Sequence, residues 1–280
     1  MTRVLVLGAH GQIGSRVVAG LRSEGAGVRA ATRHPRAGDD VLFDWADPGT
    51  WPGALDGVAA VHLLPPQGDP DPAATVGPFL ELARGGGVGR VVLLSSSAIE
   101  PGGAGLGEVH AHIALSWPEW AVLRPSWFMQ NFSGEHLQAQ SIRSADEVVS
   151  ATGDGRVGFV DVDDIAAVAV RALLDPEAHN RDHVLTGPEA LSYDEVAAVV
   201  SGAAGRTVRH RRLDVAGWTE EIAARTGLDP SFARMLADMD AAIAGGGAST
   251  LTSTVADVTG RPPGSFAEHC RRHAGAFDRV

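Results

Sequence analysis

The N-terminal stretch constrains the fold more than any other part of the sequence. An apolar run, RVLVLG, leads directly into GAHGQIG, and SRVVAGLRSEG follows with the composition of a helix. Glycines at a strand-to-helix turn in G-x-x-G-x-x-G spacing let a dinucleotide pyrophosphate approach the backbone amides at a helix N-terminus. We therefore expect a dinucleotide to be bound by Gly8, His10, Gly11, Gln12, Ile13 and Gly14. A plain glycine-rich turn is the alternative.

Short apolar runs recur along the chain with helical segments between them. They cover residues 3–8, 28–33, 41–45, 59–65, 90–96, 120–125 and 183–187. Runs that are apolar throughout are typical of strands covered on both faces, as in a parallel sheet with helices on either side. The sequence thus predicts an α/β fold with a Rossmann-type doubly wound parallel sheet. A helix with Asp163 or Asp164 as its N-cap is expected before the last strand.

After residue 188 the pattern predicts helices only, over residues 192–203, 214–226, 230–244 and 265–277. These helices would form a small C-terminal substrate lobe. We expect the dinucleotide-binding core to comprise residues 1–127, with its sheet completed by 156–188, and the lobe to comprise 128–155 and 189–280. Ser192 and Glu195 have the spacing of a capping box, which makes Tyr193 between them a structural residue.

Composition excludes several kinds of chemistry. The sequence contains no lysine, so no Schiff base, P-loop or tyrosine–lysine pair can form. One cysteine, Cys270, excludes an intrachain disulfide and a cysteine-cluster metal site, and no metal is expected. A net charge of −11 opposes nucleic-acid phosphate, and no apolar run approaches the roughly 20 residues of a membrane span. We expect a cytoplasmic protein with a small-molecule substrate and no nucleic-acid or membrane partner, either a monomer or a homodimer.

The ends of the other predicted strands carry further candidate cofactor residues. Thr32 and Arg33 end the second strand where a carboxylate would select NADH, and a guanidinium there can pair with the 2′-phosphate of NADPH. NADPH is therefore favoured, unless Arg33 simply lies in solvent. Asp44 is placed to accept from an adenine amine with Trp45 beside the ring, although a surface turn is an equal alternative. The remaining candidates at strand ends are Leu64, Pro65, Pro66, Ser95 and Pro125.

Four fragments, GAHGQIG, ATRHP, VVLLSSSAIE and LRPSWFMQNF, together resemble the NmrA-like branch of the atypical short-chain dehydrogenase/reductases. Within it the sequence is most similar to the ergot-alkaloid reductases of the festuclavine/agroclavine dehydrogenase kind. The resemblance implies a single Rossmann-type domain with a small substrate lobe, and the use of NADPH to reduce an iminium carbon. It also implies that the glycine motif and Arg33 hold the dinucleotide, and that Pro125 to Asn131 borders nicotinamide and substrate.

The helix that carries a Tyr-x-x-x-Lys pair in many such reductases contains His110 and His112 here, in GEVHAHIAL. Reduction of a neutral ketone builds an alkoxide and needs a proton donor, whereas hydride addition to an iminium ion gives a neutral amine directly. His110 is either a structural histidine or a pocket residue that shuttles a proton to a neutral imine. Ser96 either bonds substrate or closes its own turn.

We therefore predict an NADPH-dependent reductase of cyclic iminium ions or imines that works without a tyrosine–lysine acid. The substrate, imine-bearing or cationic, would be bound by Trp127, Phe128, Asn131 and Phe159. Two alternatives stay open. One is an NAD(P)H quinone or azo reductase, and the other is a redox sensor that binds NADP without catalysis.

Overall fold

Seven strands form one sheet in the order β3-β2-β1-β4-β5-β6-β9 in the computed structural model, which describes residues 2–36 and 38–279. Every pairing in this sheet is parallel, and each strand overlaps a predicted apolar run. The predicted Rossmann-type doubly wound sheet is therefore confirmed. The strands are Arg3–Val6 (β1), Gly27–Thr32 (β2), Asp40–Leu42 (β3), Ala60–Leu63 (β4), Arg90–Leu94 (β5), Glu119–Pro125 (β6) and Arg181–Leu185 (β9).

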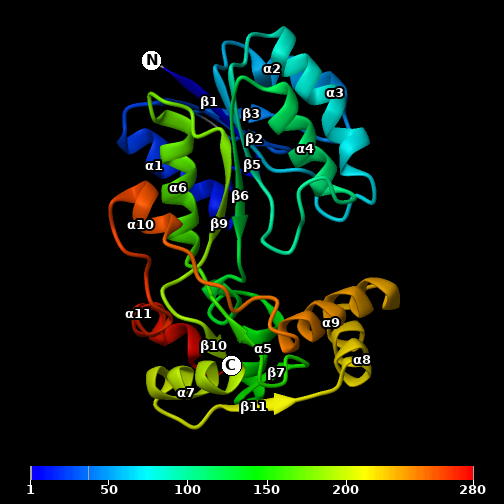
Figure 1. Ribbon diagram of the computed structural model, residues 1–280, viewed down its shortest axis with the longest axis vertical. Helices are drawn as coiled ribbons and strands as arrows, with labels where there is room; N and C mark the ends of the chain where they lie inside the picture. The colour runs from blue at the N-terminus through cyan, green and yellow to red at the C-terminus, as the bar shows by residue number, and fades with distance from the viewer. Residues whose placement is uncertain (1, 37, 280) are drawn as a thin grey trace. The chain divides into compact units, whose positions relative to one another are not determined.

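Helices cover both faces of this sheet (Figure 1). α1 (Gln12–Ser23) and α6 (Val162–Leu174) pack together on one face, and α2 (Trp51–Leu55), α3 (Pro72–Gly85) and α4 (Leu106–Ser116) lie on the other. The prediction that Asp163 or Asp164 is the N-cap of this helix is wrong, because α6 already begins at Val162. Asp163 and Asp164 lie in its first turn instead, where negative charge is favourable to the helix dipole.

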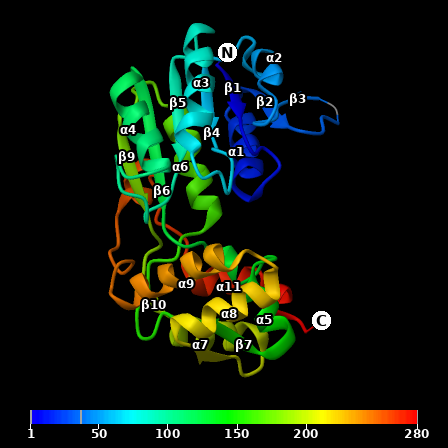
Figure 2. The same ribbon diagram turned by 90° about the vertical axis from the view of Figure 1, so that its right-hand side faces the viewer.

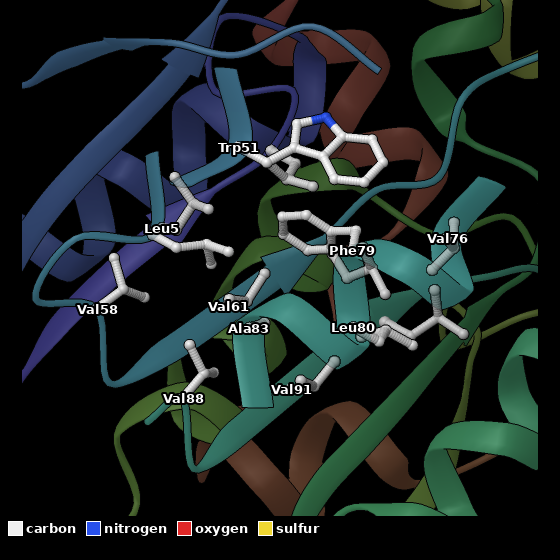
Figure 3. Packing of buried hydrophobic residues seen from close by; sticks show 14 of the residues in the cluster. Leu5, Trp51, Val58, Val61, Val76, Phe79, Leu80, Ala83, Val88 and Val91 are labelled. Carbon is white, nitrogen blue, oxygen red and sulfur yellow. The ribbon is translucent and has the colours of Figure 1, made fainter. Parts of the chain in front are cut away.

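The core under α2 and α3 is built from the apolar side chains of the strands and two large aromatic rings (Figure 3). Trp51 and Phe79 meet edge to face with ring centroids 5.8 Å apart. Leu5 and Val61 come from adjacent strands and are fully buried in the same cluster. Burial of a side chain the size of Phe79 contributes about 1.5–3 kcal/mol, so this layer holds the strand ends in fixed positions.

The chain divides into two compact units, and neither is one continuous stretch. The first unit extends to Pro125 and also contains Val162–Leu185 and Thr254–Arg261. The second contains Ser126–Asp161, Thr186–Ser253 and the chain from Pro262 onward. These units differ from the expected core and lobe at four segments. Residues 126–127, 156–161 and 186–188 belong to the second unit, and residues 254–261, with α10 (Thr254–Thr259), belong to the first.

The second unit combines helices with two small sheets. The prediction of helices alone after residue 188 is wrong, because β11 (Arg209–Arg212) pairs in parallel with β7 (Glu147–Ser150), and β10 (Leu191–Ser192) pairs antiparallel with β8 (Arg156–Val157). The main helices are α5 (Leu137–Ala145), α7 (Tyr193–Ala204), α8 (Val215–Thr226), α9 (Pro230–Ala244) and α11 (Phe266–Arg272). Figure 2 shows α8 and α9 side by side, in agreement with their extensive contacts.

The four predicted C-terminal helices are found, the last one shortened. α11 ends at Arg272, and a 3-10 turn over Ala274–Phe277 continues the chain. The capping box before α7 is also confirmed, since Ser192 accepts from the amide of Glu195 and Glu195 accepts from the amide of Ser192 at 2.8 Å. In the part of the chain that the structure describes, no helix has the length and apolar character to cross a membrane.

Candidate functional site

The glycine loop follows β1 and fits an anion against the start of α1. Gly8 has a φ of +68°, in the left-handed region that favours glycine. The amide of Gly11 donates to the carbonyl of Gly8 at 2.9 Å, and Gly11 is the N-cap of α1 without a side-chain hydrogen bond at that cap. The helix therefore begins with no side chain bonded over its first amides, where a pyrophosphate can accept hydrogen bonds from the backbone.

The same loop has no room for larger side chains. A Cβ atom on Gly14 would lie 2.1 Å from the carbonyl oxygen of Gly8, and one on Gly8 would lie 2.5 Å from the Cδ2 atom of Leu64. Glycine therefore lets the loop and the start of α1 lie this close together. No side chain then separates the loop backbone from a dinucleotide that approaches it. Ile13 is buried, so its side chain packs in the core and only its backbone is placed for cofactor contact.

The end of β2 presents an available guanidinium. Arg33 is exposed and has no hydrogen-bond or ion-pair partner among residues 2–36 and 38–279. Thr32 accepts a hydrogen bond from the amide of His34 at 3.2 Å and so orders the turn beside it. His10 already has a partner, because its Nε2 atom lies 3.1 Å from Asp40. The pKa of Asp40 is lowered mainly by the hydrogen bond that it accepts from the amide of Arg36.

Asp44 and Trp45 are held mostly by their own surroundings. Asp44 accepts from the amide of Ala46 at 3.0 Å, which closes a turn. The indole of Trp45 donates to the carbonyl of Leu64 at 3.2 Å, and its ring meets Phe79 edge to face at 5.2 Å. Trp45 therefore joins the strand end to the core, while a role for either residue at an adenine ring stays a prediction.

The fourth, fifth and sixth strands end at the same edge of the sheet as the glycine loop, because all are parallel to β1. β4 ends at Leu63, just before Leu64, Pro65 and Pro66. The sheet order also reverses between β1 and β4, and open α/β sheets bind ligands beyond the carboxyl ends of strands at such a point. The strand-end candidates of the first unit thus share one edge.

The serines after β5 differ in their partners. Ser96 Oγ accepts from the amide of Ala98 at 3.2 Å, so it closes its own turn. Ser95 Oγ is buried and has no hydrogen-bond partner among the described residues. The amide of Ser97 donates to the carbonyl of Pro125 at 2.9 Å and fixes the end of β6. Ser96 thus fits the local alternative, whereas Ser95 has unused hydrogen-bonding capacity.

His110 lies on α4, on the buried side of the helix within the first unit. Its side chain is 4% exposed and its ring centroid lies 6.1 Å from that of Trp120. Its pKa is lowered mainly by burial, with a smaller raising effect of Asp182 and a lowering effect of Arg124. Its Nδ1 atom has no hydrogen-bond partner in the described residues. A buried, neutral imidazole fits a structural histidine better than a general acid.

The segment 127–132 of the second unit, here called the substrate segment, contains both half-buried and buried side chains. Trp127, Phe128 and Asn131 are half-buried, and the Asn131 amide has no side-chain hydrogen bond among the described residues. Phe132 points inward and meets Phe159 edge to face at 5.2 Å. Phe159 is only 1% exposed, so this ring belongs to the aromatic core and the structure does not support its expected contact with substrate.

Sequence reasoning missed a buried polar network behind this segment. Asp161 accepts from the side-chain amide of Gln130 at 2.8 Å and from Arg272 at 2.7 Å, and His269 lies beside it. His269 also bonds Ser133 at 2.8 Å. The hydrogen-bonded pairs are separated by 31 to 136 positions in the chain, so no local motif could have identified them.

Other kinds of site find no support within the described residues. Residues 2–36 and 38–279 contain no group of three or more histidine, cysteine, aspartate or glutamate side chains that could hold a metal ion. Cys270 is buried, and burial raises its pKa to about 12, which leaves it a protonated, unreactive thiol.

Comparison with known proteins identifies relatives along almost the whole chain. A profile of the NmrA-like family matches residues 114–242. YesF, an uncharacterised oxidoreductase of Bacillus subtilis, is 40% identical over 274 residues, which cover 97% of this chain and 95% of that protein. Agroclavine dehydrogenase of Claviceps fusiformis is 40% identical over 235 residues, covering 81% and 80%. An NAD(P)H azoreductase of Xenophilus azovorans is 33% identical over 287 residues, covering 98% and 99%.

Proposed function

This chain belongs to the NmrA-like family, and on that premise we propose that it is an NADPH-dependent oxidoreductase whose hydride acceptor is a cyclic iminium ion or imine. The observation that carries this proposal is the absence of lysine from the sequence, together with the buried position of His110. The expected helix thus offers no tyrosine–lysine pair. Its His110 is buried, and its part-exposed His112 lies 4.0 Å from the carboxylate of Glu81. An acceptor that already carries positive charge needs no acid from this helix.

The first unit supplies the cofactor residues of this proposal. The loop from Gly8 to Gly14 would hold the pyrophosphate on backbone amides, and Arg33 would pair with the 2′-phosphate that distinguishes NADPH from NADH. NADPH, when bound, supplies the hydride. The Xenophilus relative is an NAD(P)H azoreductase, which is consistent with this assignment.

The second unit supplies the residues for the substrate. Trp127 and Phe128 offer partly exposed aromatic faces, which attract a cation through the negative face of the ring. Asn131 offers an amide that can orient the nitrogen side of the substrate. Tyr193 is not a candidate acid, because it is buried and burial raises its pKa well above the usual range. These residues would bind and orient the acceptor and exclude water, and no step requires them to donate a proton.

The proposal is tested by following NADPH absorbance with a matched panel of acceptors. The panel contains a cyclic imine, its N-methyl iminium salt, a quinone, an azo dye and a simple ketone. We expect the iminium salt to be reduced fastest and the ketone not at all, because only the iminium ion needs no proton to complete reduction. Faster reduction of the quinone or dye would replace the proposal with the alternative activity. NADPH binding without reduction of any acceptor would indicate a sensor.

A further inference from the structure

Three side chains of the second unit form a hydrogen-bonded chain that ends at the substrate segment. The Oδ2 atom of Asp161 lies 3.4 Å from Nδ1 of His269, and Nε2 of His269 lies 2.8 Å from Oγ of Ser133. Asp161 and His269 are buried, whereas Ser133 is half-buried. The chain therefore leads from a buried carboxylate to an accessible hydroxyl directly after residue 132.

The positions of the protons in this chain follow from its donors and acceptors. Asp161 receives hydrogen bonds from Gln130 and Arg272, as an ionised carboxylate does, so it can only accept from His269. His269 must then carry a proton on Nδ1, and when Nε2 carries none it is left as an acceptor. In that tautomer Ser133 donates its hydroxyl proton to Nε2. The lone pairs of Ser133 Oγ are left for a ligand.

We propose that Ser133 is a specificity-determining residue, which accepts a hydrogen bond from the N–H group of a protonated cyclic imine or amine. Asp161 and His269 are positioning residues that hold the hydroxyl in this accepting orientation. A carboxylate at the far end of the chain polarises the hydroxyl oxygen toward negative charge, which suits a cation. The carbonyl oxygens of a quinone are themselves acceptors and would face the lone pairs of Ser133. The inference rests on the proposed function and refines its substrate class.

Ser133 is not placed to act as a nucleophile, although serine, histidine and aspartate recur in hydrolases. Such a reaction needs backbone amides to stabilise the oxyanion that forms when the hydroxyl attacks. The amides of Ser133 and Gly134 both donate to the carbonyl of Gln130, at 3.3 Å and 2.8 Å, and are already used. The hydroxyl can therefore bind a ligand, and its two nearest amides offer no help to covalent chemistry.

A role of the Ser133 hydroxyl in ligand binding can be distinguished from a purely structural role. Gln130 and Arg272 bond Asp161 without involving Ser133, and α11 has its own capping box at Ser265 and a buried Phe266. His269 is the one side-chain hydrogen-bond partner of the Ser133 hydroxyl among the described residues. Replacing Ser133 with alanine thus removes the acceptor and leaves these other contacts in place.

The test compares a protonated cyclic amine with its quaternary N,N-dimethyl analogue, which has the same charge and no N–H group. Binding to the NADPH-loaded protein is measured by calorimetry, so that no turnover is required. We expect wild-type protein to prefer the N–H cation by about tenfold, the size of one hydrogen bond that involves a charged group. Ser133→Ala should abolish this preference, because it lowers the affinity for the N–H cation more than the affinity for the quaternary ion. Ser144→Ala, on the surface of α5, is the matched control.

Asp161→Asn gives a second and sharper variant. An asparagine amide can donate to Nδ1 of His269, which moves the imidazole proton to Nε2 and turns the Ser133 hydroxyl into a donor. The preference for the N–H cation should then disappear while the melting temperature confirms a folded protein. Equal affinity of the wild type for both cations, or an unchanged preference in Ser133→Ala, overturns the inference. Failure to reduce any imine overturns only the proposed function, because the binding preference is measured without catalysis.

Discussion

At Gly14, a hydrogen atom in place of a methyl group lets α1 start directly against the carbonyl oxygen of Gly8. The position that a Cβ atom would take lies 2.1 Å from that oxygen, and the obstruction is backbone, not a movable side chain. The loop must therefore open before any other residue can occupy this position. Opening the loop would displace the backbone amides that would hold the cofactor.

Gly14→Ala is expected to weaken NADPH binding by at least about tenfold and to lower stability by about 1–3 kcal/mol. The matched control is Gly77→Ala on α3, where an added Cβ meets nothing within 4 Å. That change should leave cofactor affinity intact and raise stability by about 0.5–1 kcal/mol, because alanine is a better helix former. Fluorescence titration and thermal unfolding measure both effects. Equal cofactor affinities in the two variants would contradict the assigned role of the loop.

Arg33 offers a test of cofactor choice at one side chain. Arg33→Ser removes a guanidinium that has no partner in the described protein, so folding should be unaffected. We expect the Kd for NADPH to rise about tenfold or more and the Kd for NADH to stay the same, because only NADPH carries the 2′-phosphate. Arg209→Ser changes an exposed arginine of the second unit and should alter neither value. A parallel loss of both cofactors would show that Arg33 acts on the loop instead.

At the scale of single elements, the agreement between sequence and structure depends on how much apolar pattern each element carries. The central strands β1, β4 and β5 of the main sheet are almost entirely buried and therefore form continuous apolar runs, which makes them predictable. β11 has the sequence RHRR and lies half-buried or exposed, so neither periodicity nor composition indicates a strand. It forms because β7 offers a parallel partner over Glu147–Ser150. Pairing with a distant segment cannot be derived from a local pattern.

The residues of the candidate site also fall into those that a local sequence pattern predicts and those that it does not. The glycine loop and the serines after β5 lie at strand-to-helix turns, where sequence and geometry coincide. Phe159 was expected at the substrate because aromatic side chains suit a cation, but its ring contacts Phe132 in the core. His269 is 108 positions from Asp161, and this distance hides the network from any motif. Residue type alone does not show which face of a ring remains accessible.

The start of α7 provides a test of element stability. Ser192→Ala removes the hydroxyl that accepts from the amide of Glu195 and exposes an unsatisfied donor in the first turn. We expect the free energy of unfolding to fall by about 1 kcal/mol in urea denaturation. Ser249→Ala, in an exposed loop where the hydroxyl bonds a nearby carbonyl, should cost much less. If both variants have the same midpoint, the capping box does not stabilise α7.

For the whole molecule, buried histidines make stability depend on pH. His62 on β4 is fully buried, and burial lowers its pKa from 6.5 to about 4. The unfolded chain therefore binds a proton in this range that the folded protein does not, and stability falls as pH falls from about 6.5 toward 4. Asp240 acts in the opposite direction, because burial raises its pKa from 3.8 to about 6.

His62→Leu isolates the histidine contribution. Between pH 7 and pH 5 the wild type should lose about 2 kcal/mol more of its unfolding free energy than the variant. The reason is that the unfolded chain binds one more proton than the folded protein over the roughly 1.5 pH units below 6.5, and each unit contributes about 1.4 kcal/mol. Urea denaturation at the two pH values measures this difference, and the effect of Asp240 cancels because both proteins contain it. Identical pH dependence of the two proteins would mean that His62 has the same pKa in the folded protein as in the unfolded chain.

The passage of Thr254–Arg261 back into the first unit has a consequence for synthesis on the ribosome. Arg261 pairs with Asp164 at 2.9 Å, and α10 packs on α6, so the first unit is incomplete until residues 254–261 have left the exit tunnel. A nascent chain paused after Pro125 would expose the edge of β6 that β9 later covers. Maturation of the first unit thus waits for this late segment, and stop codons before it should leave aggregation-prone fragments and no free-standing nucleotide-binding module.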